Sequence, residues 1–170
     1  IGNIIGGVGN TMSSTYGLVS GTGVSASMIG QVAQASGSFS TAGDAQASQL
    51  VVRKQTTDAT LTELALDGAS TYMTSANNKA YAFEVTLVAK QASSTNHAMY
   101  KLKWTSVRGA SAATYTVDGL VKEIIFESDS AWDVDVTADT TNGRSAIKVT
   151  GVAATTINWV AKVEMTEVTA

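Results

Sequence analysis

The chain has 170 residues, with 11 Lys and Arg, 14 Asp and Glu, a single His and neither Cys nor Pro, so its net charge is −3. The lack of Cys excludes disulfides and thiolate metal sites, and the small negative charge without a basic run argues against a nucleic-acid partner. The apolar runs are too short to cross a membrane, and the length suits one domain with an accessory segment.

The charged residues divide the chain into two parts. Residues 1–43 contain no charged side chain, and every Lys, Arg, Asp and Glu lies in residues 44–170. We therefore interpret residues 1–43 as an uncharged stalk or docking segment and residues 44–170 as a separate folded domain. Because the chain starts at Ile1 without a basic n-region, we expect a fragment or a processed product that carries no secretory signal.

Glycines in the first part recur at intervals of seven residues. Gly2 and Gly9 are seven apart, and so are Gly23, Gly30 and Gly37. A helix is disfavoured because Gly costs roughly 0.5–1 kcal/mol relative to Ala at each helical position. One alternative is a flexible Gly/Ser linker. The interpretation we prefer is short strands and tight turns stacked on neighbouring copies, with Gly at the corners and burial between chains explaining the missing charge.

The second part consists of segments with a period of two. In residues 81–90, for example, Tyr81, Phe83 and Val85 fall on one face, while Glu84 and Thr86 fall on the other. This alternation predicts half-buried strands. The expected strands cover residues 50–53, 61–66, 81–90, 100–107, 120–127, 132–138, 146–150 and 157–165. Turns are expected at 67–68, 118–119 and 139–143.

About eight strands without a sustained helical period predict an all-β fold, an antiparallel β-sandwich or jelly roll. Trp104, Trp132 and Trp159 each lie on the apolar face of a predicted strand. We expect them to pack in a shared core. The alternative is an exposed aromatic row that stacks on sugars.

Several sequence blocks resemble the C-terminal module of bacteriophage and prophage tail-fibre and related virion structural proteins. The resemblance covers roughly residues 30–168. The blocks are residues 37–48, 52–60, 63–68, 131–143, 149–151 and 157–161. The resemblance implies a virion component, assembled in the host bacterial cytoplasm, that forms a homotrimer with a repetitive stalk and a β-domain. It leaves open whether the chain belongs to a tail fibre, a spike, a head fibre or a capsid cement or decoration protein.

The residues predict neither an enzyme nor a cofactor. His97 lies in a polar stretch, and no G-x-S-x-G nucleophile elbow is present. The densest acidic group is Asp133, Asp135 and Asp139, whose oxygens could bind Ca²⁺ or, as paired carboxylates, hydrolyse glycosides. A solvated strand face and a capped turn are the interpretation we prefer, so these three residues remain metal candidates only.

Polar loops supply the candidates for contact with a receptor. Residues 91–97 and 108–115 are chosen for length and polarity, and the residues there best suited to stacking and hydrogen bonding are His97, Tyr100, Arg108 and Tyr115. The expected partners are further copies of the chain, other virion proteins through residues 1–43, and a host surface glycan. Rival functions are a carbohydrate-binding receptor domain, a decoration protein and a depolymerising enzyme.

Overall fold

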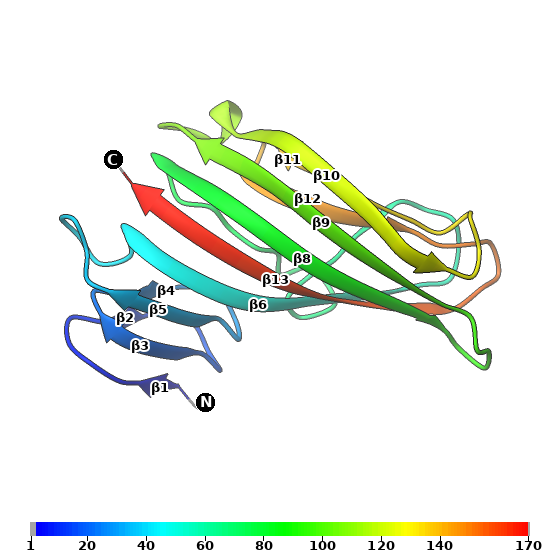
Figure 1. The fold of residues 1–170 in the computed structure, drawn as a ribbon, viewed down its shortest axis with the longest axis horizontal. Coiled ribbons are helices and arrows are strands. Elements are labelled where there is room, and N and C mark those ends of the chain that lie inside the picture. Colours follow the sequence, from blue (N-terminus) through cyan, green and yellow to red (C-terminus); the bar gives the residue numbers. More distant parts are fainter. Residues whose placement is uncertain (1–2, 170) are drawn as a thin grey trace.

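The computed structural model describes residues 3–169, which form an all-β molecule with one short 3-10 helix (Figure 1). In chain order the elements are β1 (Ile4–Ile5), β2 (Thr11–Met12), β3 (Leu18–Thr22), β4 (Ser25–Ala26), β5 (Val32–Ser36), β6 (Ala45–Thr56), β7 (Thr62–Glu63), β8 (Lys79–Gln91), β9 (His97–Arg108), η1 (Ala112–Thr114), β10 (Thr116–Glu127), β11 (Asp133–Asp139), β12 (Arg144–Thr150) and β13 (Ile157–Thr169). Within these residues no helix is long and apolar enough to span a membrane.

The second part of the chain is a sandwich, as the alternating sequence predicts. Strands β6, β13, β8, β9 and β10 pair in that order, all antiparallel, and belong to an eight-stranded sheet. The inner face of this sheet packs against a three-stranded sheet of order β11-β12-β7. Trp104, Trp132 and Trp159 are all buried between the two layers, and the rings of Trp132 and Trp159 are 5.7 Å apart. The predicted core role of the three tryptophans is confirmed.

The first part of the chain repeats with a period of 14 residues. Leu18 pairs in parallel with Ile4 and with Val32, and Thr11 pairs in parallel with Ser25. The first two 14-residue turns each contribute one strand to the layer β1-β3-β5 and one to the layer β2-β4, and the third contributes β5 alone. The glycine interval of seven is half of this repeat. We refer to residues 3–36 as the parallel stack.

Stacking of the first part on neighbouring copies stays a prediction. Within one chain, the strands of the parallel stack pair with one another across successive turns. Asparagine side chains support this pairing. The Oδ1 atom of Asn10 accepts the N–H of Val24 at 2.9 Å, and the Oδ1 atom of Asn3 accepts the N–H of Gly17 at 3.2 Å. Both bonds link residues 14 apart, so a short polar side chain satisfies a backbone donor of the next turn.

Glycine at two stacked positions allows the turns to approach closely. Gly7 and Gly21 have φ near +100°, a region that favours glycine. A Cβ atom on Gly21 would lie 1.9 Å from the carbonyl oxygen of Ala35, and one on Gly7 would lie 1.8 Å from that of Gly21. The prediction that glycines mark corners and close backbone approaches is confirmed at these positions.

One sheet runs through both parts of the chain. Strand β5 continues the parallel layer and also pairs antiparallel with β6, where Val32, Ala33 and Gln34 face Gln49, Ser48 and Ala47. The eight-stranded order is therefore β1-β3-β5-β6-β13-β8-β9-β10. In Figure 1 the blue strands of the stack lie beside the start of β6, at the end of the sandwich that also holds the C-terminus.

Three local predictions need correction. Asp118 and Gly119 do not form a turn, because they lie inside β10, where the register against β9 shifts between Asp118 and Val121. Gly119 has a positive φ, and a glycine in a β-bulge can adopt this conformation as readily as a glycine in a turn. His97 and Arg108 begin and end β9 instead of lying in loops. The strand predicted over residues 61–66 is reduced to the two residues of β7 and a single bridge at Ala65.

Candidate functional site

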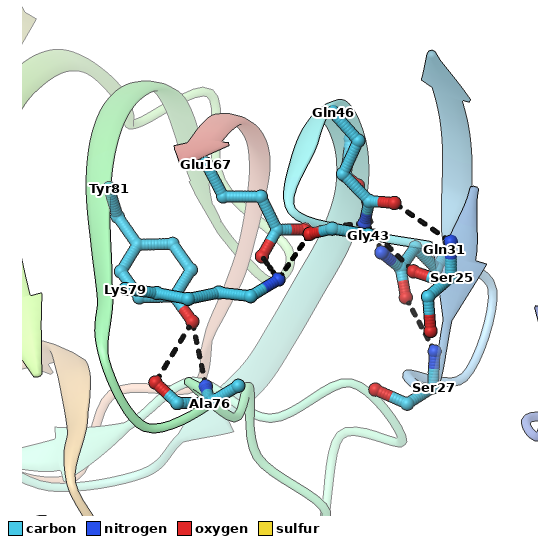
Figure 2. A network of polar contacts seen from close by, with 10 residues as sticks. Ser25, Ser27, Gln31, Gly43, Gln46, Ala76, Lys79, Tyr81 and Glu167 are labelled. Atoms are coloured by element: carbon cyan, nitrogen blue, oxygen red, sulfur yellow. Dashed lines mark hydrogen bonds and ion pairs between the residues drawn. The ribbon is translucent and has the colours of Figure 1, made fainter. Parts of the chain in front are cut away.

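A buried polar network joins the parallel stack to the sandwich (Figure 2). The Lys79 Nζ atom lies 2.9 Å from the Glu167 Oε2 atom, and the two side chains are only 15% and 7% exposed. Lys79 also donates to the Gly43 carbonyl, and Gln46 donates to the other Glu167 carboxylate oxygen. The charges of β8 and β13 therefore compensate each other beside the first charged stretch of the chain.

Two buried glutamines extend this network into the stack. The Gln46 side chain pairs with the backbone of Ser25, accepting its N–H at 2.9 Å and donating to its carbonyl at 2.8 Å. The Gln31 Oε1 atom accepts the N–H groups of Ser27 and Met28, and its Nε2 atom donates to Ser48 Oγ at 2.9 Å. In the described residues β4 pairs only with β2. The two side-chain amides therefore supply hydrogen-bond partners for backbone groups in and near β4. We call the contacts of Gln31, Gln46, Lys79 and Glu167 the junction network.

A cavity of about 320 Å³ lies beside the junction network and is lined by Ser27, Thr74, Lys79, Tyr81 and Glu167, among others. The Lys79, Tyr81 and Glu167 side chains that line it are bonded to one another or to the backbone. The Tyr81 hydroxyl, for example, accepts the N–H of Ala76 at 2.7 Å, and burial raises the pKa of Tyr81. The titratable groups of the cavity are therefore already hydrogen-bonded within the protein. We therefore interpret the junction network as a structural joint.

A short loop beside the junction presents an aromatic side chain to solvent. Phe39 is 77% exposed. The Asp44 carboxylate holds the loop, because it accepts the N–H groups of Phe39, Ser40 and Thr41 at 2.6–2.9 Å. The hydrogen bond from Thr41 is the main reason that the pKa of Asp44 lies below its usual value. The loop is thus fixed even though its most apolar residue is in water.

Two hollows flank Phe39 on the molecular surface. One has a volume of about 690 Å³ and is lined by small or apolar groups that include Gly21, Ala35, Ala45 and Val168. The other, about 600 Å³, lies between Phe39 and the end of β13. The sequence offers no periodic signal for this surface, because its residues come from β3, β5, β6 and β13 and meet only after the sheet forms.

The four residues proposed for receptor contact do not form one surface. Tyr100 and Tyr115 are buried: the Tyr100 hydroxyl donates to Glu127 at 3.0 Å, and the Tyr115 hydroxyl lies 2.8 Å from Ser145 Oγ. Arg108 is partly buried and donates to backbone carbonyls such as that of Gly143. The side chains of the two tyrosines are therefore unavailable to a large partner in this structure.

His97 is exposed and stacks on Phe126, with the ring centroids 4.7 Å apart. It lies at the opposite end of β9 from Arg108. Twelve residues of extended strand span roughly 40 Å, so the two predicted loops face opposite ends of the molecule.

The three aspartates proposed as metal candidates each have a different partner. Asp133 pairs with Lys122 at 2.7 Å, and Asp135 accepts the N–H of Val136 at 2.8 Å. Burial would raise the pKa of Asp139, but Asn142 and Arg144 outweigh this effect and the pKa is lowered. Asp139 closes the β11–β12 hairpin, as expected for a capped turn.

Comparisons with known proteins give only distant similarities. No family model matches the sequence, and no curated protein matches it significantly. Among solved structures, the chain is similar to the tailspike protein of Acinetobacter baumannii phage AM24, with 10% identity, a TM-score of 0.36, and coverage of 90% of this chain and 34% of the tailspike. It is also similar to the Acinetobacter phage vB_ApiP_P1 tailspike protein, with 16% identity, a TM-score of 0.29, and coverage of 69% and 20%. The chain thus spans about a third and a fifth of these two proteins, and such TM-scores do not establish a common fold.

Proposed function

We propose that the chain is a structural component of a bacteriophage particle, from a tail fibre, a spike or a head fibre, that assembles as a homotrimer and displays its sandwich for host attachment. The observation that carries this proposal is the single sheet that runs from the uncharged parallel stack into the sandwich through the pairing of β5 with β6. A continuous hydrogen-bonded sheet with a buried ion pair beside it connects a stalk rigidly to the domain it carries. The sequence blocks that resemble virion proteins support the same role.

The display end in this proposal is the end of the sandwich farthest from the stack. There the β8–β9 turn at residues 92–96 contacts the turn before β13, through the N–H of Ala92, which donates to the Thr156 carbonyl at 2.9 Å. Figure 1 places this end opposite the blue strands of the stack. The loop at residues 109–115 lies at the stack end instead, because it follows the last residue of β9.

The role we propose is non-enzymatic. The side chains of Gln46, Lys79 and Glu167 in the junction network bond to one another. The ring of exposed His97 contacts Phe126 and the Thr95 carbonyl, and neither contact is with a hydroxyl group that could act as a nucleophile. Incubation of the purified chain with host surface polysaccharide should leave the polysaccharide length unchanged. This part of the proposal would be overturned if the native protein shortened the polysaccharide and a variant with Asp133 and Asp135 replaced by Asn did not.

Location on the particle is tested by labelling. Gold-coupled antibodies raised against the purified chain should label purified particles of the phage that encodes it, and prior absorption of the antibodies with the chain should abolish the label. Abundant chain in infected cells with no label on purified particles would contradict a virion role.

A further inference from the structure

The outer face of the eight-stranded sheet is divided into a charged and an uncharged end. The register places one row of outward side chains across β5, β6, β13, β8 and β9, none of which is charged, and the row ends on β10 at Asp118, the partner of Thr105. From β5 to β9 the row is Gln34, Ala47, Thr166, Ala82 and Thr105. The next row toward the C-terminus consists of Ala45, Val168, Ala80 and Val107 and is also uncharged. We refer to these two rows as the uncharged sheet end.

The rest of the same face carries charges of both signs. The row next to the uncharged sheet end contains Glu164, Glu84 and Lys103, and the row after it contains Lys162 and Lys101. A protein surface that stays in water usually has about a quarter or more charged residues of both signs. The charged half fits that description and the uncharged sheet end does not, so we expect the latter to be covered.

The same end of the molecule holds both a projection and a hollow. Phe39 projects at the rim, 77% exposed, and its loop is fixed by Asp44. Beside it lies the hollow of about 690 Å³, whose lining includes Ala45, Ala47 and Val168 of the uncharged sheet end. The small side chains leave room for a ring, and a phenyl ring buried there would lose its contact with water.

We propose that the uncharged sheet end is the contact surface between copies of this chain, with Phe39 of one copy inserted into the hollow beside Phe39 of the next. This inference rests on the homotrimer of the proposed function and names the surface that would form it. A second copy fits better than a polar or charged ligand, because the two rows carry no charged side chain from β5 to β9 and the Glu167 carboxylate that lines the hollow is already paired with Lys79. One chain also supplies both the projection and the hollow. Such a head-to-tail contact closes into a ring when three copies complete the rotation, and interface cores are depleted of charge and enriched in aromatic residues.

The test measures the mass of the full chain in solution over a concentration series for matched pairs of variants. Ala82→Glu and Thr86→Glu place the same charge on the same face of β8, the first within the uncharged sheet end and the second between Lys162 and Lys101. Phe39→Ala and Phe126→Ala each remove one exposed ring. Ala82→Glu and Phe39→Ala should raise the dissociation constant at least tenfold, while Thr86→Glu and Phe126→Ala should change it less than twofold. Unchanged thermal unfolding of each variant under monomeric conditions shows that it is folded.

Disulfide cross-linking gives a second readout that does not require a dissociation constant. Because the chain contains no Cys, only the introduced cysteines can form the link. Oxidation of a mixture of the Phe39→Cys and Ala47→Cys variants should give linked dimers that contain one chain of each, and a mixture of the Phe39→Cys and Thr86→Cys variants should give no such mixed dimer. A stable oligomer that is indifferent to Phe39→Ala and Ala82→Glu, or equally sensitive to all four variants, would overturn this inference and leave the homotrimer standing. A wild-type chain that stays a monomer at every concentration would overturn both.

Discussion

The parallel stack and the sandwich reach a folded state by different means. Among the described residues, the larger core is one cluster of 25 buried hydrophobic residues that includes three tryptophans and, from the stack, only Met28. The stack's own cluster has four, Val19, Val24, Ala26 and Ala33. The stack compensates with backbone pairing between its turns, asparagine side chains that bond to the next turn, and continuation of its sheet into β6. A segment without charge and with little apolar area is therefore ordered because it is attached to a larger core.

We expect the largest loss of stability from a substitution in the sandwich core. Trp159 is fully buried, and its Nε1 atom donates to Thr56 Oγ1 at 2.9 Å. Trp159→Ala should lower the free energy of unfolding by about 3–5 kcal/mol, as measured by denaturant titration, and should unfold the stack together with the sandwich. Val19→Ala, in the small cluster, should cost less and leave the sandwich transition unchanged. Equal costs would contradict the difference between the two cores.

Removing one partner of the buried ion pair should loosen the attachment of the stack. Lys79→Met leaves the Glu167 carboxylate buried without its cation, which costs about 3 kcal/mol when a buried pair is broken. The expected result is a lower unfolding midpoint and faster amide exchange in β4 and β5 than in β9. The double variant Lys79→Met/Glu167→Gln removes both charges and should recover part of the loss. A single variant as stable as the native chain would show that the junction network contributes little.

A substitution inside the stack should have a smaller and local effect. Gly21→Ala places a Cβ atom 1.9 Å from the Ala35 carbonyl oxygen at a φ of +100°, and strain of this kind costs about 1–3 kcal/mol. Amides of β3 and β5 should exchange faster while the sandwich keeps its protection. Gly30→Ala is the matched control, because Gly30 also has a positive φ, +70°, but a Cβ atom there meets nothing within 4 Å. If the two variants behave alike, close stacking of the turns is not what requires Gly21.

The smallest effect on stability is expected from lowering the pH. The pKa of Asp44 is lowered in the folded chain, chiefly by the Thr41 N–H, so its contribution to stability is present above the unfolded pKa, near 4, and is lost as the pH falls through the folded value. Amides of Phe39, Ser40 and Thr41 should therefore exchange faster below about pH 4, before the sandwich responds. In Asp44→Asn this pH dependence should be absent. Its persistence in that variant would assign it to other carboxylates.

The sandwich could be predicted from the sequence because its strands alternate. In β13, Trp159 and Val163 point inward and Val160 and Lys162 outward, as a period of two requires. The strand pairing itself could not be predicted, since Val163 meets both Leu50 and Val85 across long separations.

The stack and the junction were only partly predictable. The glycine interval of seven was visible, but its 14-residue unit depends on two layers that alternate along the chain, with the parallel pairs Leu18 and Val32 in one layer and Thr11 and Ser25 in the other. The junction network had no local signal, because Lys79 and Glu167 are 88 residues apart. The burial of Tyr115 could not be predicted either, because its hydroxyl bonds to Ser145, which lies on a strand distant in the sequence.

Amide hydrogen exchange on the full chain decides whether the uncharged opening segment is an ordered continuation of the sandwich sheet. We expect the backbone N–H groups of β3 and β5 to be protected, with the N–H of Leu18, bonded to the Gln31 carbonyl at 2.9 Å, among the slower amides of the segment. Exchange of residues 3–36 at the rate of an unstructured chain, beside a fully protected β6 and β13, would show instead that the segment is a flexible linker.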